Sequence, residues 1–264
     1  MTRVAVEAVG LLGPGLGGWP QGAAILAGRA AYEYAPTAIA PSELLPPAER
    51  RRASVPVNLT LAVGREAFAA AGRDPSVTAA VFASSASDGE ILHRMCEALA
   101  SPAREVSPTS FLNSVHNAAA GYWSIATGCR EPLTSLCAYD GTFAAGLLEA
   151  TVQASAEQRA VALICYDQPY PEPLHAARPV KERFAVALVI APAPGERAMA
   201  AIDVRCVPSA GSATPMDDAR LETLRAGNPA ARSLPLLAAL ALRRPMEVLL
   251  PYLDDNQLAV RLTP

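Results

Sequence analysis

The chain has 264 residues and a formal net charge of −3 at neutral pH, and 51% of its residues are hydrophobic while only 5% are aromatic. This length allows one large domain or two small ones, with a core built mainly from Ala, Val and Leu. The slight acidity gives no electrostatic reason to expect binding to nucleic acid or to an anionic membrane.

The cysteines and the N-terminal residues favour a cytoplasmic protein. The 5 cysteines are scattered and form no CxxC pair, which fits a reducing cytosol better than a disulfide framework or a zinc site. Glu7 interrupts the apolar run that a signal peptide would need, and no apolar stretch approaches the roughly 20 residues of a membrane span. We therefore expect no membrane span.

No motif for a metal or a cofactor stands out. His93 and Cys96 lie one helical turn apart, but no further ligands follow at a matching spacing. The glycines of residues 10–18 have neither the GxGxxG nor the GxxxxGK[ST] spacing of a phosphate loop. We expect neither a metal nor a cofactor.

The first part of the chain predicts strands that alternate with helices. Residues 3–9 alternate into a strand, and residues 77–84 form a short apolar run that is typical of a buried strand. A helix is expected over residues 57–71, where Gly72 ends it, and another over residues 90–99.

The most distinctive run spans residues 107–128. Ser107 is a good N-cap, Pro108 a good first helical residue and Gly128 a good terminator, so one long helix is expected. Apolar side chains recur on one face of this helix, at Phe111, Val115, Ala118, Tyr122 and Ile125. Polar groups lie on its other side, at Asn113, His116 and Asn117.

A short strand, a tight turn and a helix follow directly. The strand is expected over residues 133–137, the turn over residues 138–141 and the start of the helix at Thr142. Many enzymes present a nucleophile at such a strand-to-helix turn.

The remaining residues predict mostly strands. These are expected at residues 159–165, 184–192, 198–207, 247–250 and 257–262, with a compact helix at 234–243 and a short helix at 216–225. This order of elements predicts an α/β protein whose layers are built on a mixed sheet.

The central motifs resemble the N-terminal half of β-ketoacyl-ACP synthases in the thiolase superfamily. The resemblance rests on Ser114, Asn117, Ala120, Gly121, Ser124, Gly128, Pro132, Thr134 and Gly141 at the family's spacing. It covers roughly residues 1–192. It implies a thiolase-like layered fold with a mixed sheet flanked by helices, truncated mainly to the N-terminal half. Residues 193–264 would then be a reduced C-terminal remnant packed on the same core.

Residues 110–128 together with 137–150 are similar to small ketoacyl-synthase-like subunits of aryl polyene gene clusters, which are called chain-length factors. This resemblance implies a cytoplasmic, non-catalytic subunit that forms a heterodimer with a full-length β-ketoacyl-ACP synthase. The pathway would be polyene or fatty-acid-like polyketide biosynthesis. Contact with the acyl carrier protein would be indirect.

The nucleophile motif of the family, Ala-Cys-x-Ser-Gly, is degenerate here. When its glycine is placed on Gly141, the nucleophile falls on Ala138, the middle residue on Tyr139 and the serine on Asp140. Cys137 stands one residue early, where a strand points its side chain to the other face. We expect Asp140 to cap the following helix and to disfavour a thiolate nearby.

The family also uses two C-terminal histidines, of which this sequence shows no equivalent. Downstream of Gly141 the chain has only His175, in a setting unlike the family's His-Gly-Thr. Condensation needs the nucleophile and the histidines together, so we predict a pseudoenzyme.

The resemblance further places residues 133–137 and 111–122 at the surface that meets the partner. The candidate interface or acyl-tunnel residues are Phe111, Asn113, His116, Asn117, Tyr122, Trp123, Leu136, Tyr139 and Phe143. Two alternatives stay open. One is a thiolase-fold acyltransferase or hydrolase that uses Cys137 with His116, and the other is a homodimeric module that binds a carrier protein or a lipid.

Overall fold

A mixed eight-stranded sheet forms the centre of the computed structural model, which describes residues 2–209 and 211–264. Its strand order is β3-β2-β4-β5-β1-β6-β8-β7, and β3, β2 and β4 are parallel whereas the other neighbours are antiparallel. The strands are β1 (Thr2–Leu12), β2 (Ala79–Ala83), β3 (Leu133–Leu136), β4 (Val161–Asp167), β5 (Phe184–Ala191), β6 (Ala200–Pro208), β7 (Met246–Leu253) and β8 (Asn256–Thr263). The predicted α/β arrangement with a mixed sheet is confirmed.

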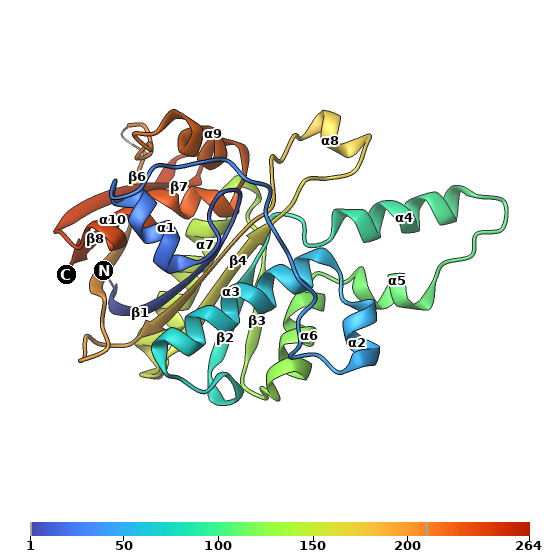
Figure 1. Cartoon of the computed structure of the whole chain (residues 1–264), viewed down its shortest axis with the longest axis horizontal. Helices are drawn as coiled ribbons and strands as arrows, with labels where there is room; N and C mark the ends of the chain where they lie inside the picture. Colours follow the sequence, from blue (N-terminus) through green and yellow to red (C-terminus); the bar gives the residue numbers. More distant parts are fainter. Residues whose placement is uncertain (1, 210) are drawn as a thin grey trace.

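Helices cover both faces of this sheet (Figure 1). They are α1 (Trp19–Leu26), α2 (Pro47–Arg52), α3 (Val55–Ala71), α4 (Gly89–Ala100), α5 (Pro108–Asn113), α6 (Ala118–Thr127), α7 (Thr142–Glu157), α8 (Leu174–Ala177), α9 (Ala219–Gly227) and α10 (Leu234–Leu242). Short 3₁₀ turns are η1 (Pro75–Val77), η2 (Tyr139–Gly141) and η3 (Ala230–Ser233). The sequence did not predict α1, α2 and α8.

The central strands are buried on both faces, which explains their continuous apolar sequences. Strand β2 shows the alternation, because Val81 packs with α7 and α10 in one core cluster while Phe82 packs with α3 and α6 in the other. None of the helices in the described residues is long and apolar enough to cross a membrane.

The predicted helix terminators are confirmed. Gly72 and Gly128 adopt left-handed conformations, with φ of 59° and 72°, at the ends of α3 and α6. The Ser107 hydroxyl accepts the N–H of Ser110 and so caps α5.

The prediction of one continuous helix over residues 107–128 is wrong. The run is split into α5 and α6, and residues 114–117 form the bend. Polar side chains compete with the helical hydrogen bonds there. The Asn113 amide donates to the carbonyl of Arg52 on α2, and the Ser114 hydroxyl donates to the carbonyl of Phe111.

The C-terminal strands extend the same sheet. Strand β6 pairs with β1, where Val4 lies opposite Ile202, and β8 and β7 continue outward. Side chains of β6, β7, β8 and α10 share a core cluster with β1 and α7. The division at residue 192 into an N-terminal domain and a remnant stays a prediction.

Candidate functional site

The predicted strand, turn and helix are confirmed around the degenerate nucleophile motif. Strand β3 ends at Leu136, the turn η2 follows, and α7 begins at Thr142. The Thr142 hydroxyl accepts the N–H of Ala138 at 3.0 Å and donates to the carbonyl of Tyr139 at 2.6 Å. Tyr139 has a φ of 50°, a conformation that costs free energy for a residue with a side chain.

The structure corrects the role predicted for Asp140. The N-cap of α7 is Gly141, and no side chain caps that helix. The Asp140 carboxylate instead accepts hydrogen bonds from the guanidinium groups of Arg178 and Arg232, each at 2.9 Å. Because two cations compensate its charge, Asp140 repels a nearby negative charge less than we expected.

Arg178 joins this turn to the ends of two central strands. Its guanidinium lies 3.7 Å from the centroid of the Tyr139 ring and donates to the Tyr170 hydroxyl at 2.8 Å. That hydroxyl lies 3.1 Å from the hydroxyl of Ser85, which follows β2. Ser85 donates in turn to Asp167 at the end of β4 at 2.7 Å. This network therefore connects the turn to the ends of β2 and β4.

Asp167 is the buried acid of this network. One of its oxygens accepts the hydroxyl of Ser84 and both the N–H and the hydroxyl of Ser85. Burial raises the pKa of Asp167 to about 6, against the opposing effect of the Ser85 hydrogen bonds and the Arg178 charge. The sequence analysis missed Arg178, Arg232 and Asp167. A usable signal was present, because polar residues end the adjacent apolar strands β2 and β4.

The turn is also held by a close backbone approach at Gly141. A Cβ atom on this residue would lie 2.2 Å from the carbonyl oxygen of Tyr252 on β7. We expect Gly141→Ala to lower the free energy of unfolding by roughly 1–3 kcal/mol, because the backbone of β7 must shift. Chemical denaturation of the purified chain measures it.

Gly121→Ala is the matched control for that substitution. Gly121 lies inside α6, and a Cβ there would meet no atom within 4 Å. Alanine favours a helix interior over glycine by up to about 1 kcal/mol, so this variant should be as stable as the original chain or more stable. Equal stability losses in the two variants would contradict the role of the Tyr252 contact.

The two candidate catalytic residues lie near the same strand ends but are not joined. The Nε2 atom of His116 lies 3.4 Å from the carbonyl oxygen of Ser84, and Cys137 is exposed after β3. No hydrogen bond links Cys137 to His116 in residues 2–209 and 211–264. His175 lies on α8, and its buried Nδ1 has no partner in the part of the chain described.

The predicted interface residues divide into exposed and buried groups. Phe111 and Tyr139 are each 62% exposed, and Asn117 is exposed as well, while His116 and Leu136 are half-buried. Asn113, Tyr122, Trp123 and Phe143 are buried.

Tyr122, Trp123 and Phe143 are not on the exposed surface of this chain, and their role at the interface or acyl tunnel stays a prediction. The Trp123 ring lies 5.4 Å from Phe68 and 6.2 Å from Phe82, between α3 and the sheet. Phe143 lies in the opposite core cluster. These aromatic side chains complete the core because α6 and α7 are pressed against the two faces of the sheet.

Exposed apolar side chains gather instead on the segment that projects beyond the sheet edge. Figure 1 shows α4 and α5 extending away from the body of the molecule. We call this segment, residues 89–113, the arm. Its exposed apolar residues are Leu92, Leu99, Phe111 and Leu112. The sequence analysis missed all of them except Phe111.

Comparison with known proteins places this geometry in a family. The model of the β-ketoacyl synthase N-terminal domain matches residues 21–244. A search of curated proteins finds no match.

Solved structures with ketosynthase names share the fold. The complex of the ketosynthase ApeO with its chain length factor ApeC from Xenorhabdus doucetiae is 20% identical, with a TM-score of 0.74 and 99% of each chain covered. The ishigamide ketosynthase/chain length factor is 14% identical, with a TM-score of 0.72 and 99% of each chain covered. A β-ketoacyl synthase from Burkholderia phymatum STM815 is 15% identical, with a TM-score of 0.61. The match covers 92% of this chain and 71% of the Burkholderia chain.

These similarities concern the fold, and they confirm the predicted thiolase-like architecture. The structure spans nearly the whole of the matched chain in the first two cases, but only part of the Burkholderia synthase. Since the family model also covers most of the sequence, the chain belongs to the β-ketoacyl synthase N-terminal domain family.

Proposed function

We propose that this protein is a non-catalytic, ketoacyl-synthase-like subunit of the chain-length-factor type. The observation that carries the proposal is the turn between β3 and α7, which keeps the strand-to-helix geometry but has Ala138 at the nucleophile position. Around it, Arg178 and Arg232 bind Asp140, so that this carboxylate is paired with two cations. A scaffold kept without its nucleophile is best suited to binding a partner.

The partner in this proposal is a full-length β-ketoacyl-ACP synthase, and strand β3 is the central contact. β3 is an edge strand, so one side of its backbone has no neighbouring strand in the described residues. The carbonyls of Pro132 and Leu136 face β2, where they accept the N–H groups of Ala80 and Ser84. By the alternation of a parallel ladder, the N–H and C=O of Ser135 point to the free side. This edge can pair with a strand of the partner.

The arm supplies apolar area for the same interface. Phe111 and Leu112 are 62% and 66% exposed, and Leu92 and Leu99 are 52% and 54% exposed. Fully burying a Leu or Phe side chain contributes about 1.5–3 kcal/mol, so a partner that covers these residues would gain considerable free energy. Side chains of this kind are costly to leave in water on a monomer.

Substitution of Ser135 tests the pairing of β3. We expect Ser135→Pro to abolish co-purification with a co-expressed full-length β-ketoacyl-ACP synthase from the same organism. Proline removes the outward N–H and leaves the ladder to β2 intact, because that ladder uses the neighbouring residues. Ser135→Ala is the control, since it removes only the hydroxyl and should leave the complex unchanged.

Two outcomes would count against the proposal. The first is an isolated chain that stays monomeric in the presence of the synthase. The second is loss of pathway product in Cys137→Ala. That result would favour the alternative of an acyltransferase or hydrolase that uses Cys137 and His116. Unchanged product in that variant supports a non-catalytic subunit.

The finer assignments belong to the same proposal. They are a heterodimer, indirect contact with an acyl carrier protein through the synthase, and a polyketide pathway of the aryl polyene or fatty-acid-like kind. The partner and product can be identified by purifying the complex and determining the length of the acyl chain that it makes with and without this subunit.

A further inference from the structure

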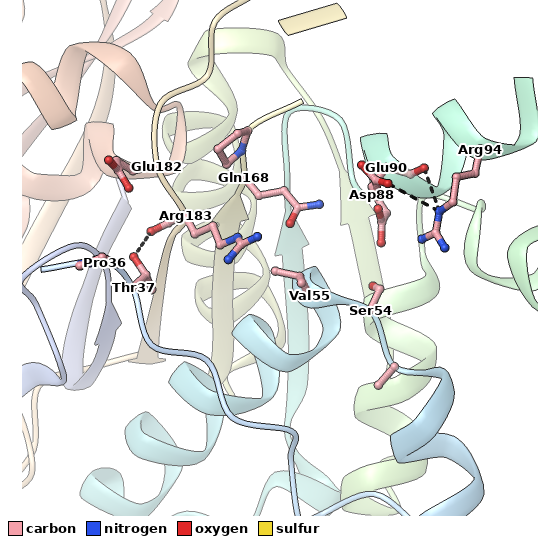
Figure 2. Close-up of a pocket in the computed structure, with 12 residues that line it drawn as sticks. Pro36, Thr37, Ser54, Val55, Asp88, Glu90, Arg94, Gln168, Glu182 and Arg183 are labelled. Atoms are coloured by element: carbon pink, nitrogen blue, oxygen red, sulfur yellow. Dashed lines mark hydrogen bonds and ion pairs between the residues drawn. The ribbon is translucent and has the colours of Figure 1, made fainter. Parts of the chain in front are cut away.

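A polar cavity separate from the nucleophile turn lies beside the starts of α3 and α4. It has a volume of about 560 Å³ and none of the residues 137–141 lines it. Figure 2 shows the side chains that converge on it from α3, α4 and the segments that flank β4 and β5. Its lining includes Ser54, Val55, Asp88, Gln168 and Arg183.

The Gln168 side chain is the least expected feature of this cavity. The residue is only 8% exposed, and its amide makes no hydrogen bond to any residue in the described ranges. Figure 2 shows the amide directed into the cavity, next to the guanidinium of Arg183. The amide atoms are open to the space of the cavity, and no protein group bonds them there. A ligand in the cavity would satisfy it.

Further donors surround the same space. Arg183 forms no ion pair in residues 2–209 and 211–264. The 17-residue helix α3 begins beneath it, and its N-cap Ser54 makes no side-chain capping bond. Free N–H groups at the start of a helix favour an anion, and here the Val55 N–H and the Ser54 hydroxyl are without partners in the described chain.

The acidic residues of the cavity, by contrast, already have partners. Glu90 lies 3.7 Å from Arg94, and Glu182 accepts the hydroxyl of Tyr34 at 2.9 Å. The carboxylate of Asp88 caps α4 by accepting the N–H of Ile91 at 3.1 Å. The unpartnered groups are therefore mainly hydrogen-bond donors, and they lie on the side of Arg183 and Val55.

We propose that this cavity binds an oxyanion, the carboxylate or phosphate group of a small molecule, on Arg183, Gln168 and the start of α3. A planar guanidinium, an amide and helical N–H groups are the donors that such anions use. The volume admits a whole metabolite and not only the anionic group. The three donor groups lie outside β3 and the arm, although Glu90 and Arg94 of the arm also line the cavity.

Calorimetric titration of the purified chain tests the proposal, with inorganic phosphate and acetate as separate probes. Ionic strength is kept constant with sodium chloride, so that general screening does not change. We expect saturable binding of at least one probe, and the stronger one distinguishes a phosphate ligand from a carboxylate ligand. Arg183→Gln and Gln168→Leu should each weaken binding about tenfold or more, since each removes a buried or charge-assisted bond.

Arg104→Gln is the matched control, because it makes the same change of charge on an exposed residue that does not line the cavity. It should change the affinity by less than about twofold. Gln168→Met serves as a second variant if Gln168→Leu does not fold. Absence of saturable binding with both probes would overturn the proposal, as would an equal effect of Arg183→Gln and Arg104→Gln. Neither result bears on co-purification with a synthase.

Discussion

Replacing Trp123 with alanine should lower the free energy of unfolding of the isolated chain by about 3–5 kcal/mol. The Trp123 side chain is 1% exposed and fills the space between α3 and the sheet. A Cβ on Gly64 would lie 2.4 Å from its ring, so α3 presents no side chain at this point of the contact. Urea denaturation at neutral pH measures the loss.

Phe111→Ala separates this core effect from an effect on a partner. Phe111 lies on the arm and is 62% exposed, so its removal should change the stability of the isolated chain by no more than about 0.5 kcal/mol. It should instead weaken the proposed complex with a synthase. If Trp123→Ala left stability unchanged and only weakened the complex, the burial described for α6 would be wrong.

The sequence was sufficient to predict the elements whose signals are local. The strands β2, β4 and β5 are short apolar runs that are buried on both faces, and that pattern is visible in the sequence. The ends of α3 and α6 follow from Gly72 and Gly128, which adopt the left-handed conformation that glycine favours. The resemblance of the turn before Gly141 then identified the fold.

The sequence did not predict which face of residues 107–128 is buried. The apolar positions of residues 107–128 predict a helix with one buried stripe, but Phe111, Val115 and Ile125 of that stripe are exposed. Trp123, outside the stripe, is buried instead. The bend between α5 and α6 rotates the two halves relative to each other, and it depends on a contact between Asn113 and α2, 61 residues away.

The ion pairs of the candidate site were even harder to predict from the sequence. A carboxylate just before a helix is typical of an N-cap, which is why Asp140 was assigned that role. Its two actual partners, Arg178 and Arg232, follow 38 and 92 residues later. Only the tertiary structure brings the end of α8, with Arg178, and the turn η3, with Arg232, to Asp140, so no local pattern could predict this ion cluster.

The stability of the chain should depend on the protonation of Asp167. Burial raises the pKa of Asp167 from 3.8 to about 6, so the folded state keeps this proton to a higher pH than the unfolded chain does. The contribution of the group is therefore fully present below about pH 4 and is lost as the pH rises through 6. A change of that size corresponds to about 3 kcal/mol.

Comparison with Asp167→Asn isolates this contribution from those of other acids. We expect the stability of the original chain relative to the variant to fall by about 3 kcal/mol between pH 4 and pH 7. The asparagine does not titrate, and any cost of its buried amide is the same at every pH. Urea denaturation at several pH values measures the difference, and parallel curves for the two proteins would contradict the prediction.

Ser85→Ala tests the same acid in another way, because it changes the pKa of Asp167 without removing the carboxyl group. The hydroxyl of Ser85 donates to the Asp167 carboxylate at 2.7 Å and lowers the pKa of that group. Without this bond the charged form of Asp167 is less favoured, so the loss of stability should move to higher pH.

The charge of Asp167 also bears on the turn between β3 and α7. Ser85, which bonds Asp167, also contacts Tyr170, and Tyr170 accepts a hydrogen bond from Arg178, which lies over the Tyr139 ring. Deprotonation of Asp167 would therefore strengthen the attraction on Arg178 from the strand side, and the charge state of one buried acid would be coupled to the geometry that this turn presents to a partner.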